Sequence, residues 1–299
     1  MTGWLIYDNK GAKRNTWFIN EVIGYAKKRG AVIKLMIVQK LVLSVSDGGF
    51  CVIYENQKQE KPDFVLNRTI FPFLSRYFEK NSVDVFNCAD VSEICNDKRK
   101  THLYLMNKNI PMMETRFFDR RFFECGSSDE FYPCVVKPAN GHGGNGVFIV
   151  NNYKELNKIV KSYETDEFLL QKIASEKGCD LRVYIIANKI TAAVIRKSEN
   201  DFRSNFSLGG SVSLYSLSES EEKTVKSVMS HFDLAYAGID FVFDSGEMKL
   251  NEIEEDALNM ELVKRMDEKE DYIPGGKDYL KEMNMMDHFF RKNTDKIFN

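Results

Sequence analysis

The chain has 299 residues, of which 43% are hydrophobic and 29% are charged, and its formal net charge is −2 with a pI near 6.2. This composition predicts two or three folded units rather than a disordered chain, and the near-neutral charge excludes a general attraction to nucleic acid or to an acidic membrane. The first 30 residues lack a secretory signal pattern and no apolar run is long enough to cross a bilayer, so we expect a cytoplasmic protein.

The first 90 residues predict a doubly wound α/β unit. A strand over residues 4–7, a polar turn, a helix over 15–29 and a strand over 31–38 form a β-α-β start. A hairpin around Asp47-Gly48-Gly49 follows, and then come a core strand over 64–66, a helix over 72–80 and a short strand over 85–87. No glycine fingerprint follows the first strand, so this unit is predicted to be a scaffold rather than a nucleotide site.

One residue of this unit is a candidate for substrate binding. Asn67 and Arg68 follow the strand over 64–66 at its carboxyl end, where open α/β sheets bind ligands. Arg68 therefore binds an anionic substrate in one interpretation and is an ordinary surface arginine in the other.

A second candidate lies at the start of the next helix, which opens at Asp97-Lys98 and ends at Ile110-Pro111. A lysine in the first turn of a helix is unfavourable beside the positive end of the helix dipole. Lys98 is therefore predicted to meet an anion.

Residues 134–150 hold the most informative motif: an apolar run ending in Lys137, a glycine-rich turn and a second apolar run. The glycines of the turn are Gly141, Gly143, Gly144 and Gly146. Their G-x-G-x-x-G spacing is typical of dinucleotide sites, but the β-branched and aromatic residues that follow predict a strand instead of a helix. No Gly-Lys-Ser/Thr follows, which excludes a P-loop. We predict a hairpin whose amides and lysine bind phosphate, with a flexible hairpin tip as the alternative.

The second half of the chain alternates strands and helices. We expect a helix over residues 154–162, a strand over 168–172, an antiparallel pair over 181–186 and 190–196, and a helix over 218–232 that starts with a capping box at Ser218 and Glu221. The loop over 201–210 combines charged, amide and glycine residues, as binding loops do. Two helices over 256–270 and 277–292 carry no legible chemistry. Their apolar faces are predicted to pack within the chain, with a homo-oligomer interface as the alternative.

Three carboxylates lie in or just beyond the last two predicted strands, over residues 236–243 and 248–253. Asp240 lies in the first strand, Glu252 in the second and Glu254 just beyond it. Glu252 and Glu254 are two apart, so both face the same side of a strand. A buried carboxylate is costly unless it is paired or binds a metal. Oxygen ligands without a soft partner favour magnesium or manganese, and acidic residues solvated at a sheet edge are the alternative. The six cysteines and four histidines have no zinc or disulfide spacing, and no nucleophilic cysteine is expected.

Taken together, these motifs resemble the ATP-grasp superfamily, and most closely its ribosomal-protein S6 (RimK-type) glutamate ligases. The matching positions, in order, are Asn87, Asp97-Lys98, Val135-Val136-Lys137, the loop from Gly141 to Val147, Gly178-Cys-Asp180-Leu-Arg182, Asp201-Phe-Arg203-Ser-Asn205 with Gly209-Gly210, and Gly238-Ile-Asp240. They cover roughly residues 60–256.

The resemblance implies an α/β (α+β) ATP-grasp fold with an N-terminal doubly wound α/β (pre-ATP-grasp) domain. It implies an N-terminal domain over residues 1–90, a lid subdomain over 91–165 and a large subdomain over 166–299. It also implies a carboxylate–amine ligase that uses ATP and magnesium, forms an acyl phosphate from a small-molecule or peptide acid, and releases ADP and phosphate. An ATP-grasp kinase and a nucleotide-binding protein without turnover are the alternatives.

The resemblance further implies a role for individual residues. Lys98, Lys137 and the glycine loop would bind the nucleotide phosphates, backbone groups at Lys172 and Ile173 the adenine, and Asp180 the ribose. Arg182, Arg203 and Asn205 would stabilise the phosphates and the acyl intermediate, and Asp240, Glu252 and Glu254 would hold magnesium. Glu254 departs from the family, which usually has asparagine there, so glutamate is not carried over as the substrate.

Overall fold

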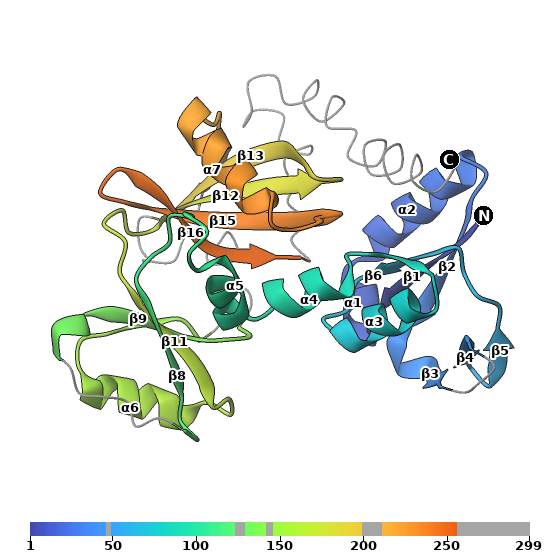
Figure 1. Ribbon diagram of the computed structural model, residues 1–299, viewed down its shortest axis with the longest axis horizontal. Helices are drawn as coiled ribbons and strands as arrows, with labels where there is room; N and C mark the ends of the chain where they lie inside the picture. The colour runs from blue at the N-terminus through green and yellow to red at the C-terminus, as the bar shows by residue number, and fades with distance from the viewer. Residues whose placement is uncertain (46–48, 123–128, 142–145, 199–210, 256–299) are drawn as a thin grey trace.

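The computed structural model describes residues 1–45, 49–122, 129–141, 146–198 and 211–255. These residues form three main sheets and one small sheet. In Figure 1 the N-terminal sheet occupies one end of the molecule, and the other two main sheets lie together at the opposite end.

The N-terminal sheet has the order β2-β1-β6-β7, and its neighbouring strands are parallel. The elements of this unit are β1 (Thr2–Tyr7), α1 (Asn9–Arg14), α2 (Thr16–Lys28), β2 (Val32–Ile37), η1 (Val38–Lys40), β6 (Phe64–Asn67), α3 (Pro72–Lys80) and β7 (Asp84–Phe86). Alternate residues of β1 pack on opposite faces: Leu5 with α2, and Trp4 and Ile6 with α3. Both faces are covered, which confirms the doubly wound prediction.

A small antiparallel sheet extends this unit, with β3 (Leu41–Ser44), β4 (Cys51–Tyr54) and β5 (Gln57–Gln59). The predicted hairpin is confirmed as β3 and β4, whereas residues 46–48 at its turn lie outside the described residues. The polar turn predicted after the first strand is instead the helix α1. Asp8 caps α1 by accepting from the Gly11 amide, and no residue of α1 is buried, so apolar periodicity could not reveal it.

Two helices lead from the N-terminal unit to the others, α4 (Ala89–Cys95) and α5 (Lys98–Leu105). Sequence analysis predicted α5 but missed α4, whose seven residues are too few to show a helical period. Val91 and Cys95 of α4 pack in the core of the large sheet. Figure 1 shows both helices in the middle of the molecule, between the N-terminal sheet and the other two.

The lid sheet has the order β10-β9-β11-β8 and is antiparallel. Its elements are β8 (Thr115–Asp119), η2 (Asp129–Phe131), β9 (Cys134–Pro138), β10 (Phe148–Val150), α6 (Tyr153–Ser162) and β11 (Glu167–Lys172). β9 and β10 are the predicted glycine hairpin, with Phe148 opposite Val136. β11 lies beyond residue 165, so this sheet extends past the predicted lid boundary.

The large sheet has the order β14-β13-β12-β15-β16 and is antiparallel. Its elements are β12 (Cys179–Ile186), β13 (Lys189–Lys197), β14 (Ser211–Leu214), α7 (Glu219–Met229), β15 (Tyr236–Asp244) and β16 (Glu247–Glu254). One face carries apolar side chains, among them Leu181 and Ile239, that pack with Val225 and Val228 of α7. The predicted capping box of α7 is present at Ser218 and Glu221. The predicted C-terminal helices lie outside the described residues.

Asn87 joins the N-terminal unit to the large sheet. Its side-chain amide donates to the Tyr236 carbonyl at 2.8 Å and accepts from the Ala235 amide at 2.9 Å. The Tyr236 hydroxyl donates to the Asn67 carbonyl at 2.8 Å. Because these groups are buried, the contacts hold the start of β15 against the carboxyl end of β6.

Candidate active site

The face of the large sheet opposite α7 carries a group of buried charges. Arg182 and Asp240 lie opposite each other on β12 and β15, and Asp180 lies opposite Arg196 on β12 and β13. Arg182 donates two hydrogen bonds to the Asp240 carboxylate, at 2.6 and 2.5 Å, and Arg196 donates two to the Asp180 carboxylate, at 2.5 and 2.6 Å. Such forked pairs hold both partners in one orientation.

Asp240 is at the centre of this group. It is 1% exposed, and its Oδ2 atom also accepts from Arg196 Nη2 at 2.9 Å. Burial by itself would raise the pKa of Asp240, but Arg182 and Arg196 outweigh it and hold the pKa at about 2. Asp240 is therefore a carboxylate at neutral pH.

A β-bulge in β16 gives the site face two consecutive side chains. The register with β15 shifts between Asp240 and Phe241, so that Glu252 pairs with Asp240 but Leu250 pairs with Phe241. Asn251 is the extra residue. In a regular strand Leu250 and Glu252 would share a face, whereas here Leu250 lies in the apolar core and Glu252 faces the charges.

Two lysines from other elements meet Asn251 and Glu252. Lys98 at the start of α5 donates to Glu252 Oε2 at 2.9 Å and to the Gly141 carbonyl at 2.5 Å. Lys137 at the end of β9 donates to Asn251 Oδ1 at 2.9 Å. The site therefore lies where α5, the lid sheet and the large sheet meet.

Burial affects the two lysines differently. Burial and the neighbouring charge of Lys98 lower the pKa of Lys137 to about 8. Burial also lowers the pKa of Lys98, but attraction to Glu252 outweighs it and the pKa is raised. Lys137 is thus the more readily deprotonated of the two, because it donates to neutral amides, those of Asn251 and Gln171.

The two glutamates of β16 also differ. Burial opposes the charged form of both, but the pKa of Glu252 is lowered because Lys98 and Lys137 together outweigh burial. The pKa of Glu254 is raised by burial and by the negative charges of Glu252 and Asp240, despite its 2.7 Å contact with Arg182. Glu254 is therefore the more readily protonated of the two.

The sequence matches the RimK-like ATP-grasp domain family over residues 95–264. The chain belongs to this family. Among relatives, a probable alpha-L-glutamate ligase of Stenotrophomonas maltophilia is 26% identical over 230 residues, covering 73% of this chain and 78% of that protein. An uncharacterized protein of Mycoplasma genitalium, MG011, is 27% identical over 265 residues, covering 87% and 85%.

Solved structures confirm the ATP-grasp fold. The D-alanine–D-alanine ligase of Bacillus anthracis, complexed with ATP, has a TM-score of 0.68 at 16% identity and covers 99% of each chain. The ATP-grasp ligase PsnB, complexed with a phosphomimetic variant of a minimal precursor, Mg and ADP, has a TM-score of 0.63 at 15% identity, covering 88% of this chain and 92% of that one. The α/β (α+β) class with an N-terminal doubly wound unit, as predicted, is the class observed.

The site of this ATP-grasp protein holds the predicted Lys98, Lys137, Arg182, Asp240, Glu252 and Glu254 together. Gly141 and Gly146 flank the part of the glycine loop that is not described, and Gly146 has a φ of +78° with no room for a Cβ beside Pro138 and Tyr163. Gly143, Gly144, Arg203 and Asn205 lie outside the described residues.

Three predicted ligand contacts stay predictions. The amide of Lys172 at the end of β11 donates to the Glu114 carbonyl, and its side chain donates to the Glu130 carbonyl at 2.9 Å. Ile173 follows directly. Both oxygens of Asp180 bind Arg196, so contact with a ribose would require Asp180 to share one of them.

The predicted metal ligands Asp240, Glu252 and Glu254 share one face of the large sheet, but each already forms an ion pair with a lysine or an arginine of the protein. Within the described ranges, no group of three or more His, Cys, Asp or Glu side chains is arranged to hold a metal ion. In the same residues, no helix is long and apolar enough to cross a membrane. Binding of magnesium at Asp240, Glu252 and Glu254 remains a prediction.

Four residues of the site were not predicted from the sequence: Gln171, Arg196, Asn251 and His102. Arg196 and Gln171 had a usable signal, because each directly follows an apolar run within its strand. Asn251 had none, since only the bulge places its side chain beside Lys137.

His102 of α5 is 4% exposed, and its Nδ1 atom lies 2.8 Å from the Lys98 carbonyl. Its buried Nε2 atom has no hydrogen-bond partner among the described residues. Burial and the charge of Lys137 lower the pKa of His102 to about 4, so the ring is neutral at pH 7.

We therefore expect stability to depend on pH through His102. Between pH 6.5 and 4 the unfolded chain binds a proton at this histidine that the folded protein does not bind. The free energy of unfolding therefore decreases as the pH is lowered through this window, by up to about 3 kcal/mol in total. Urea unfolding of His102→Gln should show a shallower pH dependence in this window. His231→Gln is the control and should keep the wild-type slope; equal slopes for wild type and His102→Gln would contradict the prediction.

Proposed function

We propose that this protein is an ATP- and magnesium-dependent ligase that joins a carboxylate of an amino acid or peptide to an amine, with release of ADP and phosphate. The observation that carries the proposal is the buried group in which Lys98 and Lys137 meet β16 beside Arg182 and Asp240. Membership of the RimK-like family and relatives named as probable alpha-L-glutamate ligases support it. Structural neighbours named as ligases are complexed with ATP, or with Mg and ADP.

The charge balance of the site explains why nucleotide and metal would bind together. Four cations, Lys98, Lys137, Arg182 and Arg196, face four carboxylates, Asp180, Asp240, Glu252 and Glu254. Triphosphate oxygens would add negative charge that the protein alone does not balance. Magnesium prefers oxygen ligands and is usually shared with substrate phosphates. The residues present fit such an ion, with Glu252 and Glu254 better placed than Asp240, both of whose oxygens already accept from arginines.

The chemistry has two steps. A carboxylate oxygen of the substrate attacks the γ-phosphorus of ATP, the bond from that phosphorus to the ADP oxygen breaks, and an acyl phosphate forms. The amine nitrogen then attacks the acyl carbon, the bond from that carbon to the phosphate oxygen breaks, and phosphate leaves as the nitrogen loses a proton. Both steps move negative charge between oxygens.

Residues of this chain would act by position and charge. Lys98 and Lys137 are held side by side by Glu252 and Asn251, and they would bind the phosphates that enter between the lid and large sheets. Arg182 and Arg196 are fixed by Asp240 and Asp180, and their guanidinium groups would bind the transferred phosphoryl group and the carboxylate. Bound magnesium would neutralise charge on the phosphates. No nucleophilic side chain is needed.

The test is ADP formation from ATP and magnesium with a panel of amino acids and peptides, given singly and in pairs. We expect ADP release that requires both an acid and an amine. With hydroxylamine in place of the amine, a ligase gives a hydroxamate from the activated acid, whereas a kinase that phosphorylates a hydroxyl gives none. Glu252→Gln should lose activity, and Glu247→Gln, an exposed substitution at the far end of the same strand, should retain it. ADP release without hydroxamate would contradict the ligase.

A further inference from the structure

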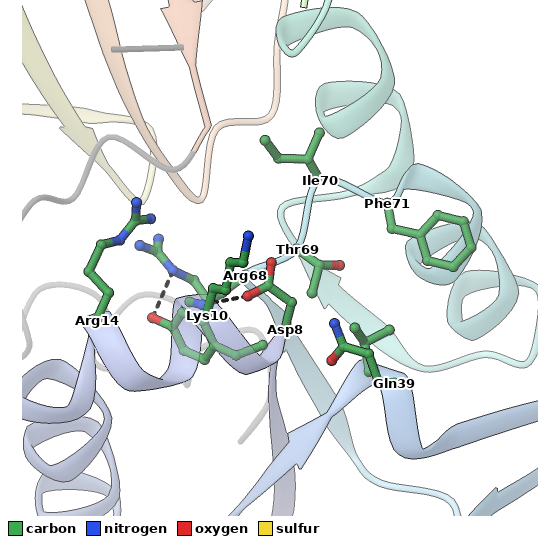
Figure 2. A pocket seen from close by; sticks show the side chains of 11 residues that line it. Asp8, Lys10, Arg14, Gln39, Arg68, Thr69, Ile70 and Phe71 are labelled. Carbon is green, nitrogen blue, oxygen red and sulfur yellow. Dashed lines mark hydrogen bonds between the residues drawn. The ribbon is translucent and has the colours of Figure 1, made fainter. Parts of the chain in front are cut away.

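One feature outside the active site is a cavity of about 680 Å³ at the carboxyl end of the N-terminal sheet. Figure 2 shows Lys10, Arg14 and Arg68 gathered along it. Arg68 is 8% exposed, and its Nε atom donates to the Tyr7 hydroxyl at 3.2 Å, so the alternative of an ordinary surface arginine is wrong. Binding of an anionic substrate at Arg68 stays a prediction.

In the active site, Lys137 lies at the end of a chain of hydrogen bonds that begins at the Met113 carbonyl. The Thr115 hydroxyl of β8 donates to that carbonyl at 2.9 Å. The side-chain amide of Gln171, which lies opposite Thr115 on β11, donates to the Thr115 oxygen at 3.1 Å. Lys137 of β9 donates to Gln171 Oε1 at 3.1 Å. The chain of hydrogen bonds therefore crosses three neighbouring strands of the lid sheet.

The direction of these hydrogen bonds is set by the Met113 carbonyl. A carbonyl can only accept, so the single hydroxyl hydrogen of Thr115 is used there. The Thr115 oxygen can then only accept, which turns the NH₂ group of Gln171 toward it and the Oε1 atom toward Lys137. Met113, Gln171 and Lys137 are buried, so water does not readily replace a lost partner. A backbone carbonyl thus determines which end of the Gln171 amide meets the lysine.

Lys137 uses two of its three ammonium hydrogens in this arrangement. One is donated to Gln171 Oε1 and one to Asn251 Oδ1, and both acceptors belong to neutral amides. Because the bonds around an ammonium nitrogen are tetrahedral, fixing two hydrogens also fixes the direction of the third. The third hydrogen, which no described residue accepts, is therefore aimed in one direction and is available to a phosphate oxygen.

We propose that Thr115 is a positioning residue for nucleotide binding, because it holds the Gln171 amide in the orientation that Lys137 needs. Gln171 and Asn251 then aim the third ammonium hydrogen of Lys137 at a phosphate oxygen of the bound nucleotide. Thr115 acts through Gln171 and Lys137 and not by contact with the ligand. This inference rests on the proposed function for the identity of the ligand, but it is testable by binding, without turnover.

The test measures the affinity for ADP in the presence of magnesium by isothermal titration calorimetry. Thr115→Val removes the hydroxyl but keeps the shape of the side chain. The buried NH₂ group of Gln171 then lacks its acceptor, so the amide rotates and Oε1 leaves Lys137. We expect ADP to bind at least about tenfold more weakly, since a hydrogen bond to a charged group is lost.

Two further variants are the controls for this substitution. Thr115→Ser keeps the hydroxyl and should bind ADP as the wild type does. Thr191→Val is the matched control on β13, because the Thr191 hydroxyl also donates to a backbone carbonyl, that of Tyr184, at 2.9 Å. It lies outside the lid sheet and should leave the affinity unchanged. An equal loss in Thr191→Val would overturn the proposal.

A double-mutant cycle separates positioning from a general loss of packing. Gln171→Met removes both polar ends of the amide and should weaken ADP binding as much as Thr115→Val does. In the Gln171→Met background, Thr115→Val should cause no further loss, since no amide remains to be held. Equal losses from Thr115→Val in the two backgrounds would overturn the proposal. Wild-type affinity in Gln171→Met would overturn it even if Thr115→Val does not fold.

The outcomes also separate this inference from the proposed function. Weaker ADP binding by Thr115→Val, together with a wild-type protein that binds ADP but forms no hydroxamate, would contradict the ligase and leave this inference intact. Wild-type ADP affinity in Thr115→Val, together with hydroxamate formation, would overturn this inference and support the ligase. Absence of ADP binding by the wild-type protein would contradict both.

Discussion

Replacing Arg182 by Gln is expected to lower the free energy of unfolding by about 3–5 kcal/mol, because it leaves buried carboxylates without their cation. Arg182 is 9% exposed and holds both Asp240 and Glu254. Burial by itself would lower the pKa of Arg182, yet these carboxylates raise it, so its charge is retained at any pH used for unfolding. Urea unfolding at pH 7 measures the loss.

Lys226→Gln is the control for this substitution. Lys226 forms an ion pair with Glu222 on the surface of α7, with side chains 65% and 45% exposed, and such pairs contribute about 0–1 kcal/mol. A loss below about 1 kcal/mol for Arg182→Gln, similar to that of the control, would show that the buried pair is not needed for the fold. Arg182→Lys keeps the charge but not the forked geometry, so we expect an intermediate loss.

Replacing Lys137 by Ala is expected to reduce turnover with ATP about 10²–10³-fold, because a cation that would contact the phosphates is removed from a site closed to water. Lys137 is 4% exposed. Lys34→Ala is a control at an exposed lysine of β2 and should retain activity. Circular dichroism and thermal unfolding of both variants separate a loss of chemistry from a loss of fold. Wild-type turnover in Lys137→Ala would contradict a role in phosphate binding.

The affinity for ATP is expected to fall above pH 8. The pKa of Lys137 in the ligand-free protein is about 8, whereas bound phosphates favour the charged form. Above pH 8 binding must therefore take up a proton, which costs up to about tenfold in affinity for each further pH unit until the pKa of the bound state is reached. Nucleotide titrations between pH 7 and 9.5 measure this slope. Lys137→Arg, whose guanidinium stays charged, should show a flatter profile.

Several elements could be predicted because their signal is local. Apolar residues at a helical spacing predict α2, and the capping box at Ser218 and Glu221 predicts the start of α7. The hairpin of β9 and β10 follows from glycines between two apolar runs. By contrast, α1 and α4 have six and seven residues, and neither is long enough to display a helical period.

For the site, residue types could be predicted but contacts could not. Charged side chains in apolar strands, such as Asp240 and Glu252, stand out because burying a charge without a partner is costly. Which partner each would find depends on strand pairing, and it is the pairing of β12 with both β13 and β15 that brings Arg182 and Arg196 to Asp240.

Local sequence patterns were enough to predict most helices and strands, the motif order that places this chain among ATP-grasp proteins, and most of the charged residues of the site. That Asn251 and Glu252 share a face follows from strand pairing in the folded protein, since one bulged residue changes the side-chain alternation of β16. Only packing decided the charge state of Lys137 and His102, because the pKa of a buried group depends on neighbours that come from distant parts of the chain.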